Sequence, residues 1–550
     1  MENLKKIPKI YWLLLMVAII GSVNFFYSYG TVAGGGDESL VINSVLKFFR
    51  DFSLADKHET LLPGVIILYI PFIVLVLTAY LFLGLGNISQ LKELIIIDTY
   101  KLTPYFRLVT VIFGIITVYL FYRICLEIFK KERLSLIASY LLTTSLLFVQ
   151  QIHLAGAWMA QTMMILISVY YFLILLKKQK WCIWDFIISA LLIVLSIEIE
   201  AVGLIAVVPF FLVCWQRRKD MKVRRWIINL SLFFLLIILG LIFFAYLNPV
   251  TFRLYSSTFN NATHLGLKET SYGRDIWGRI LDPFWIMILV EPLLFGLALL
   301  GAIIACRKNK FLWRFFGLYA FFYYFVLGPL LGGVIERRLL PVIPVLALFA
   351  ALFIDSLPKK IIYGSLLVFL INPLIFDAVL LKKGSIIEAQ KWINENIPVN
   401  SSILDKCRFG LNENKEVLNK IAQNYPSFLT TERKYLLDNP ALLANKKGYF
   451  VISDKEIINT LDAKKFQYLD ICYLADRNKI KALEFLQNTK MVKIYDSTVN
   501  REETFGLDPF FLTNFSNNFK KSGLFSLFNA PYYGPSIEIY ELKNEILKKR

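Results

Sequence analysis

Two acidic residues, Asp37 and Glu38, follow three consecutive glycines shortly after the first apolar run of the chain. A carboxylate in such a place can remove the proton from an attacking hydroxyl group, which is general-base catalysis. The alternative is structural: Asp37 caps the next helix, and Glu38 complements the dipole of its first turn. The two roles are compatible, because a capped and rigid carboxylate is also a well-positioned base. Asp37 and Glu38 are therefore candidate catalytic residues.

A basic cluster lies much further along, where Glu336, Arg337 and Arg338 precede Leu-Leu-Pro and open another apolar run. The planar guanidinium group can bind two phosphate oxygens at once in charge-assisted hydrogen bonds. The alternative is that these arginines anchor the end of a membrane span by snorkelling. Positive charges are disfavoured on the outer side of a membrane, where the topology below places them, so phosphate binding is the favoured reading. Glu336 is a candidate substrate-binding residue beside them.

Three further polar residues lie at the ends of apolar runs: His153, Glu198 and Glu200. His153 could bond a substrate hydroxyl, or it could be a tolerated interfacial residue. A charge at the centre of a span costs about 2.5 to 3.5 kcal/mol on insertion scales, but much of that cost vanishes at a tight outer turn. The two glutamates therefore either mark such a turn or contact an acceptor or a metal. No metal site is predicted, but the two glutamates and Asp37 could converge on a metal.

Composition indicates the elements that must position these residues. The chain has 550 residues, of which 57% are hydrophobic and only 18% charged, and apolar runs long enough to cross a bilayer recur from Tyr11 to Leu381 and then cease. The predicted fold is an all-α polytopic membrane domain over residues 1–381, followed by a small α/β or α+β domain over residues 382–550. The net charge of +19 raises the alternative of nucleic-acid binding, but no basic face interleaved with aromatics and no recognition motif is present.

The positions of the basic residues predict the topology, because such residues concentrate on the cytoplasmic side of a membrane. The turns around His153, around Glu198 to Glu200 and around Gly332 to Arg338 are short and mostly free of basic residues, so they are predicted to face outward. The basic clusters, predicted to be cytoplasmic, are Lys5 to Lys9, Lys130 to Arg133, Lys177 to Lys180, Arg217 to Arg225, Arg307 to Lys310, and Lys359 with Lys360. About eleven spans satisfy this pattern: 10–28, 107–127, 134–152, 156–176, 182–197, 201–215, 226–246, 284–305, 311–330, 339–355 and 361–381. The prediction is a multi-pass protein of the cytoplasmic membrane, with a cytoplasmic N-terminus and an extracytoplasmic C-terminal domain.

The first outer loop, residues 29–106, contains two patterned segments. Leu40 to Phe52 has apolar residues at helical spacing, which is typical of a helix that lies flat on the membrane. Residues 61–86 are apolar and long enough to cross, but a crossing would place every later basic cluster on the outer side. The prolines and glycines of this segment favour a bent or re-entrant hairpin. A twelfth span, paired with another unrecognised one, is the alternative.

The C-terminal domain shows mixed signals. Strands are predicted at Ser402 to Asp405, Tyr449 to Ser453, Val492 to Tyr495 and Ile537 to Tyr540. Helices are predicted at Ser385 to Asn396, Lys415 to Asn424 and Ile480 to Gln487. No Gly-rich phosphate loop or nucleophile elbow is present, so this domain is expected to shape access for the acceptor rather than to do chemistry.

Taken in order, these motifs resemble the GT-C glycosyltransferases. The resemblance rests on the early Asp37-Glu38 pair, on Arg107-Leu108 at the start of the next span, and on the Arg-Arg-Leu-Leu-Pro run from Arg337, with Pro344 after it. The protein O-mannosyltransferase and aminoarabinose (lipid A) transferase branch is the most similar. Glu388 to Pro398 is also similar to the helix that often starts the extracytoplasmic domain of bacterial members.

The resemblance implies an inverting transfer of a sugar from a polyprenyl-phosphate donor to an acceptor on the outer face. Asp37 would then be the general base, and Arg337, with Arg338 and Arg107, would bind the phosphate of the donor. No cofactor is implied beyond the lipid-linked sugar, and the acceptor is a protein, a lipid or a glycan. The chain departs from the family at the second outer turn, where His153-Leu154-Ala155 replaces an Arg and an Asp, and at Arg338, which replaces an aromatic residue.

Two other functional classes stay open. A polytopic transporter would place its charges near the membrane midplane on broken helices and would tend to show internal repeats. The notable charges here fall at span ends and no repeat is visible. A polymerase or ligase of lipid-linked sugars shares the outer-face chemistry and is harder to distinguish.

Overall fold

The structure is a computed structural model that describes part of the chain, given by residue range at the end of this paragraph. The described residues divide into two compact units. The first unit contains the described residues up to Asp377, apart from Gln90 and Thr103. The second unit contains Gln90, Thr103 and the described residues from Ala378 onward. The described residues are 8–23, 45, 70–82, 90, 103–218, 223–247, 281, 283–284, 286–288, 290–327, 336–405, 411, 413–424, 426, 429, 431–443, 448–453, 466–472, 489–495 and 537–542.

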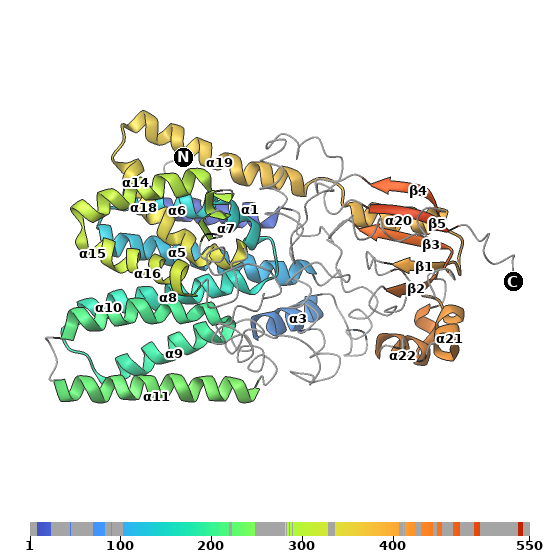
Figure 1. The fold of residues 1–550 in the computed structure, drawn as a ribbon, viewed down its shortest axis with the longest axis horizontal. Coiled ribbons are helices and arrows are strands. Elements are labelled where there is room, and N and C mark those ends of the chain that lie inside the picture. The colour runs from blue at the N-terminus through green and yellow to red at the C-terminus, as the bar shows by residue number, and fades with distance from the viewer. Residues whose placement is uncertain are drawn as a thin grey trace. The chain divides into compact units, whose positions relative to one another are not determined.

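The first unit is a helical bundle in which long helices run side by side, for example α9 between α8 and α11 (Figure 1). Its helices coincide with the apolar runs of the sequence, because a helix satisfies every backbone hydrogen bond within its own segment. They are α1 (Lys9–Ser22), α3 (Ile70–Phe82), α5 (Thr103–Phe129), α6 (Glu132–Thr144), α7 (Leu146–Ile152), α8 (Ala157–Lys177), α9 (Ile183–Ile199), η4 (Ala201–Ala206), α10 (Val207–Arg217), α11 (Val223–Leu247), α14 (Pro292–Lys308), α15 (Lys310–Leu312), η6 (Trp313–Gly317), α16 (Leu318–Phe322), η7 (Tyr323–Leu327), η8 (Glu336–Val342), α18 (Ile343–Asp355) and α19 (Lys359–Leu380).

Every predicted span overlaps helical residues, but the number of spans stays a prediction. Among the described residues, five helices are long and apolar enough to cross a membrane, or six if α6 and α7 together form one span. Within the predicted re-entrant segment 61–86, the described residues form one helix, α3, with Pro71 at its second position. Residues 29–44 and 46–69, which hold the acidic pair and most of the predicted interfacial helix, lie outside the described residues.

Two predicted spans are interrupted. The helix predicted over 134–152 bends by 64° between α6 and α7, where Ser145 caps α7 and its side chain accepts a hydrogen bond from the Phe148 amide. The span predicted over 284–305 breaks at Glu291, which precedes Pro292, the first residue of α14. The two breaks meet: the Glu291 carboxylate accepts hydrogen bonds from Ser145 Oγ at 2.7 Å and from Leu147 N at 2.9 Å. A buried acid therefore satisfies the amide and hydroxyl donors that the bend leaves without helical partners.

Helices α14 and α18 approach each other closely. A Cβ atom at Gly301 would lie 1.7 Å from the Phe349 carbonyl oxygen, so only glycine fits there. Small residues allow membrane helices to approach until their backbones touch. This contact aligns α18, and with it η8 and its arginines, against the rest of the bundle.

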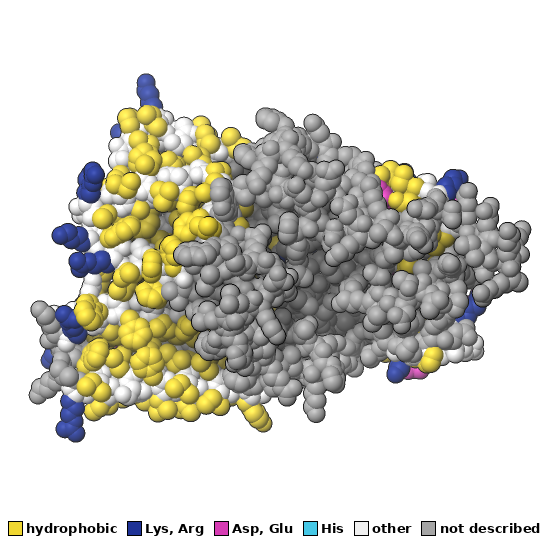
Figure 2. All heavy atoms as spheres, in the orientation of Figure 1, with side chains coloured by type: hydrophobic (Ala, Val, Ile, Leu, Met, Phe, Trp, Pro, Cys, Tyr) yellow, Lys and Arg dark blue, Asp and Glu magenta, His cyan; other side chains and the backbone are white. Residues whose placement is uncertain are grey.

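The outer surface of the bundle is apolar. Figure 2 shows hydrophobic side chains spread over the exposed face of the helices, and Lys and Arg side chains gathered along one end of the bundle. Large exposed residues such as Leu191, Ile242 and Leu367 are each at least half accessible. A soluble protein rarely exposes an apolar surface of this extent, so this face is suited to lipid contact.

The second unit is built on a mixed sheet, in agreement with the predicted α/β or α+β type. The sheet has the order β2-β1-β3-β5-β4, in which β1 pairs in parallel with β2 and β3, whereas β5 is antiparallel to β3 and β4. The four predicted strands are present, and β3 was missed. The strands are β1 (Ser402–Asp405), β2 (Phe450–Ser453), β3 (Tyr468–Cys472), β4 (Thr489–Tyr495) and β5 (Ile537–Leu542), and the helices are α20 (Ser385–Asn396), α21 (Lys415–Asn424), α22 (Thr431–Asp438) and η10 (Pro440–Leu443). The helix predicted at Ile480 to Gln487 lies outside the described residues.

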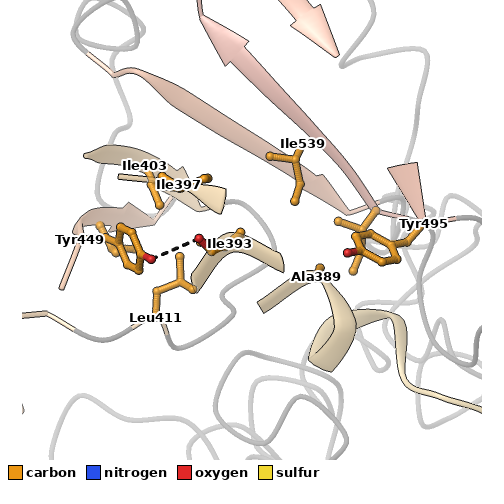
Figure 3. Packing of buried hydrophobic residues seen from close by; sticks show 10 residues of the cluster. Ala389, Ile393, Ile397, Ile403, Leu411, Tyr449, Tyr495 and Ile539 are labelled. Atoms are coloured by element: carbon orange, nitrogen blue, oxygen red, sulfur yellow. Dashed lines mark hydrogen bonds between the residues drawn. The ribbon is translucent and has the colours of Figure 1, made fainter. Parts of the chain in front are cut away.

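The core of the second unit lies between α20 and the sheet (Figure 3). Ala389 and Ile393 of α20 are fully buried and pack with Ile403 and Ile539 of the strands. The buried Tyr449 hydroxyl donates a hydrogen bond to the Ile393 carbonyl at 3.2 Å. The apolar face predicted for residues 385–396 is thus the face that packs on the sheet.

Candidate functional site

The basic residues at one end of the bundle are tied together by ion pairs and backbone contacts. Glu127, near the end of α5, pairs with Lys130 and with Lys177 at the end of α8. Arg133 at the start of α6 lies 3.3 Å from Asp355 at the end of α18. Lys178 pairs with Asp185 at 2.8 Å near the start of α9. The ends of α5, α8 and α18 and the starts of α6 and α9 therefore lie at the same end of the bundle, called the basic end below.

The described candidate site residues lie at the opposite ends of these same helices. Arg107 is twenty residues before Glu127 on α5, which corresponds to about 30 Å at the rise of an α-helix. Arg337 precedes Asp355 by a similar length of helix, and His153 ends α7, which continues from α6. Glu198 lies at the end of α9, far from Asp185. We call this group of helix ends the distal end of the bundle.

Two of the distal arginines are inside the protein. Arg107 is 5% exposed and Arg337 is 7% exposed. A snorkelling arginine extends its guanidinium group away from the protein towards the lipid headgroups, so a pure anchor would be exposed. Burial of these two side chains therefore favours an internal role over anchoring.

The short helix η8 places Arg337 and Arg338 against several other elements. It packs against α7 and α8 as well as α18. The Tyr319 hydroxyl donates to the Pro341 carbonyl at 3.1 Å, and the Tyr323 hydroxyl donates to the Arg338 carbonyl. Glu200 and the Arg338 guanidinium both lie within electrostatic range of the Tyr323 hydroxyl. The arginine cluster and the end of α9 thus meet around one tyrosine.

His153 makes three contacts at the distal end. Its Nδ1 lies 2.7 Å from the Val149 carbonyl, which can only accept, so Nδ1 carries a proton. Its Nε2 lies 3.5 Å from Oδ1 of Asp377 on α19, and the Phe376 ring packs on the imidazole with centroids 5.2 Å apart. Burial, with a smaller contribution from the nearby Arg107 guanidinium, lowers the pKa of His153 to about 4. The ring is therefore neutral at pH 7, and a hydrogen bond between Nε2 and Asp377 needs a proton on the carboxyl group.

The two glutamates at the end of α9 differ in exposure. Glu198 is buried in the last turn of α9, whereas Glu200 is partly exposed and precedes η4. Two residues before Glu198, the Ser196 hydroxyl accepts a hydrogen bond from Gln161 Nε2 of α8 at 3.2 Å. Within the described part of the chain, no group of three His, Cys, Asp or Glu residues could hold a metal ion.

Several predicted site residues have no described side chain. Asp37 and Glu38 lie outside the described residues, and Glu336 is described only as the first residue of η8. The structure thus brings together Arg107, His153, Glu198, Glu200, Arg337 and Arg338 at the distal end, and the roles of all the candidates stay predictions.

Sequence reasoning missed Glu291, a buried acid in a predicted span, and Asp377, a partly exposed acid in another. The signal was present, since an acid within an apolar span is costly and is a functional or structural site by default. Asp377 lies in the predicted span 361–381 and belongs to the distal end through its contact with His153. Glu291 is engaged by Ser145 and Leu147 and has a structural role.

No protein-family model matches this chain, and no curated protein matches it. Among solved structures it is similar to ArnT from Cupriavidus metallidurans bound to undecaprenyl phosphate, with 13% identity, a TM-score of 0.43, and coverage of 70% of this chain and 72% of that chain. The apo state of the same protein gives 13% identity, a TM-score of 0.41, and coverage of 78% and 71%. The Archaeoglobus fulgidus oligosaccharyltransferase, in complex with Zn and sulfate, gives 12% identity, a TM-score of 0.44, and coverage of 84% and 68%.

ArnT and the oligosaccharyltransferase are both GT-C glycosyltransferases, the superfamily that the sequence motifs resemble. At these identities and TM-scores, the similarity assigns neither an activity nor a residue role to this chain.

Proposed function

We propose that this protein is an integral-membrane glycosyltransferase that moves a sugar from a polyprenyl-phosphate donor to an acceptor on the outer face of the membrane. The observation that carries the proposal is the burial of Arg107 and Arg337 at the end of the bundle opposite the basic end. Positive charge concentrates on the cytoplasmic side of membrane proteins, so the distal end faces outward. Buried guanidinium groups at that depth suit the phosphate of a lipid carrier.

The reaction follows from the charges that develop in it. The acceptor hydroxyl attacks the anomeric carbon while Asp37 takes its proton, which typically contributes about 10² to 10⁴ in rate. The bond between the anomeric carbon and the phosphate oxygen breaks, its electron pair stays on the phosphate, and attack from the opposite face inverts the anomeric configuration. Arg337, together with Arg338 and Arg107, stabilises the negative charge on the departing phosphate. No metal or other cofactor takes part in this scheme.

A transporter is the main alternative class, and the distribution of buried charge bears on it. A transport site near the midplane would use acids and broken helices to hold its substrate. Two predicted spans are broken here, one between α6 and α7 and the other just before α14. Glu291, at the second break, accepts hydrogen bonds from Ser145 and Leu147 at the first, so its carboxyl group is already occupied. Of the other buried charges described in the bundle, Asp185 pairs with Lys178 at the basic end, whereas Arg107, Glu198 and Arg337 lie at the distal end. This distribution favours chemistry at one face over passage through the bundle.

The proposal is tested by measuring carrier binding and sugar transfer with the full chain in lipid nanodiscs. Undecaprenyl phosphate should bind, and Arg337→Ala should weaken that binding at least tenfold. Arg133→Ala at the basic end is the matched control, because it removes an arginine paired with Asp355 and should leave binding unchanged. Asp37→Asn should retain donor binding and lose at least 100-fold in transfer. Unchanged binding in Arg337→Ala, or equal losses in both arginine variants, contradicts the proposed phosphate site.

A further inference from the structure

Three glutamine side chains are buried near the distal end and have polar atoms without hydrogen-bond partners among the described residues. Gln150 and Gln151 lie on α7 and are 4% and 3% exposed, and Gln161 lies one turn into α8 and is 0% exposed. The unpartnered atoms are Oε1 of Gln150, Nε2 of Gln151 and Oε1 of Gln161. Buried polar groups are nearly always hydrogen-bonded, so each of these three amides needs a ligand or ordered water.

The helices that carry these amides surround the arginine cluster. α7 and α8 both pack against η8, which holds Arg337. On α7, Phe148 and Ile152 face Gly114 of α5. Successive residues of an α-helix are about 100° apart, so Gln150 projects about 180° away from the direction midway between Phe148 and Ile152. Gln150 therefore lies on the face of α7 away from α5. Gln161 bonds to Ser196, two residues from Glu198, and so lies on the side of α8 that faces the end of α9.

The chemistry of these atoms selects the kind of ligand. The side-chain oxygens of Gln150 and Gln161 accept hydrogen bonds, and the side-chain nitrogen of Gln151 donates them. A ligand that satisfies all three must be neutral and offer both donors and acceptors. A phosphate offers only acceptors at neutral pH and would meet the Gln150 and Gln161 oxygens unfavourably. Hard metal ions accept amide oxygens mainly together with carboxylates, and among the described residues no group of three His, Cys, Asp or Glu could hold such an ion. The hydroxyl groups of a sugar ring both donate and accept.

We propose that Gln150, Gln151 and Gln161 form the subsite that binds the sugar ring of the lipid-linked donor. This inference rests on the proposed function, and divides donor recognition between the arginines for the phosphate and the amides for the sugar. Because buried amides lose hydrogen bonds when the ligand lacks a matching hydroxyl, such a subsite discriminates strongly between sugars.

The test compares two classes of probe on the full chain in nanodiscs: undecaprenyl phosphate alone, and its monoesters with glucose, mannose, galactose, N-acetylglucosamine and aminoarabinose. At least one ester should bind ten times more tightly than the bare carrier. Gln150→Leu and Gln161→Leu should each remove most of that gain and leave the affinity for the bare carrier unchanged. Gln161→Asn is the milder second variant, and retained binding of the bare carrier shows that each variant is folded.

Asn229→Leu on α11 is the matched control, because Asn229 is also a buried amide with an unpartnered Nδ2 among the described residues. It should not alter the gain from the sugar. The subsite is overturned if no ester binds more tightly than the bare carrier, if the glutamine variants weaken both probe classes equally, or if they weaken neither. Failure of the bare carrier to bind is a different result, which contradicts the proposed function itself.

Discussion

The two ends of the helical bundle carry charge in opposite ways. At the basic end, Lys130 and Lys177 are more than half exposed, and their partner Glu127 is partly exposed. At the distal end, Arg107, Arg337 and His153 are nine-tenths or more buried. Exposed charges gain little from pairing and mainly set orientation in the membrane. Buried charges are costly and persist where the surrounding structure or a ligand compensates them.

The largest expected effect concerns sidedness, since it is all-or-none. In a chain without native cysteines, Lys180→Cys reports on the turn between α8 and α9 at the basic end. Leu154→Cys reports on the turn at the other end of α8, and Asn400→Cys reports on the C-terminal unit. A membrane-impermeant maleimide added to intact cells should label positions 154 and 400 and leave position 180 unlabelled until the membrane is opened. Labelling of position 180 in intact cells reverses the proposed orientation.

The next effect separates the structural acid from the distal charges. Glu291→Ala removes the acceptor of the Ser145 hydroxyl and of the Leu147 amide, and each buried donor left without a partner costs about 1 to 3 kcal/mol. The free energy of unfolding, measured by SDS titration, should fall by about 3 to 5 kcal/mol. Glu291→Gln keeps one acceptor and should lose less than half of that. A loss below about 1 kcal/mol in Glu291→Ala would mean that the bend between α6 and α7 does not depend on this acid.

The positions of the helices could be predicted from the sequence, but their interruptions could not. Apolar runs such as 156–176 and 226–246 match α8 and α11 within a few residues, because a long apolar segment has no other stable form in a bilayer. At the bend, Ser145 donates a hydrogen bond to Glu291, 146 residues away in the chain, and no local pattern reports such a partner. Strand β3 was missed because Tyr468 to Cys472 is short and has an acid at its centre.

The candidate site was predicted in the same uneven way. Arg337, Arg107 and His153 could be found because charged or titratable residues at span ends stand out from apolar neighbours. Asp377 was missed, since its role is visible only where α19 meets the end of α7. The glutamines of α7 and α8 were missed because amides are ordinary in helices, and only their burial without partners distinguishes them.

A third prediction uses the buried imidazole of the distal end. The pKa of His153 is lowered to about 4 in the folded protein, against about 6.5 in the unfolded chain. A group with a depressed folded pKa is most stabilising above its unfolded pKa, so this contribution is complete above pH 6.5 and is lost as pH falls towards 4. Between pH 6.5 and 5 the free energy of unfolding should fall by about 2 kcal/mol from this residue.

The matched variant for that measurement is His153→Gln, which cannot titrate. Its free energy of unfolding should depend less on pH over the same window, whereas Arg133→Ala at the basic end should keep the wild-type slope. Equal slopes in wild type and His153→Gln would show that the imidazole is not held neutral.

The smallest effect belongs to the basic end and sets two weak terms against each other. Lys130 has φ of 53°, in the left-handed region, and its ammonium group lies 2.6 Å from Glu127. The exposed pair contributes little, because water and salt screen it, whereas a left-handed conformation costs a residue with a side chain about 1 to 2 kcal/mol. Lys130→Gly loses the pair but relieves the backbone, so its free energy of unfolding should rise by about 0.5 kcal/mol. Lys130→Ala loses the pair and keeps the backbone cost, so it should fall slightly. If both variants lose the same stability, the loss of the ion pair outweighs the relief of the left-handed backbone. Charge at the basic end would then contribute more to stability than its exposure indicates.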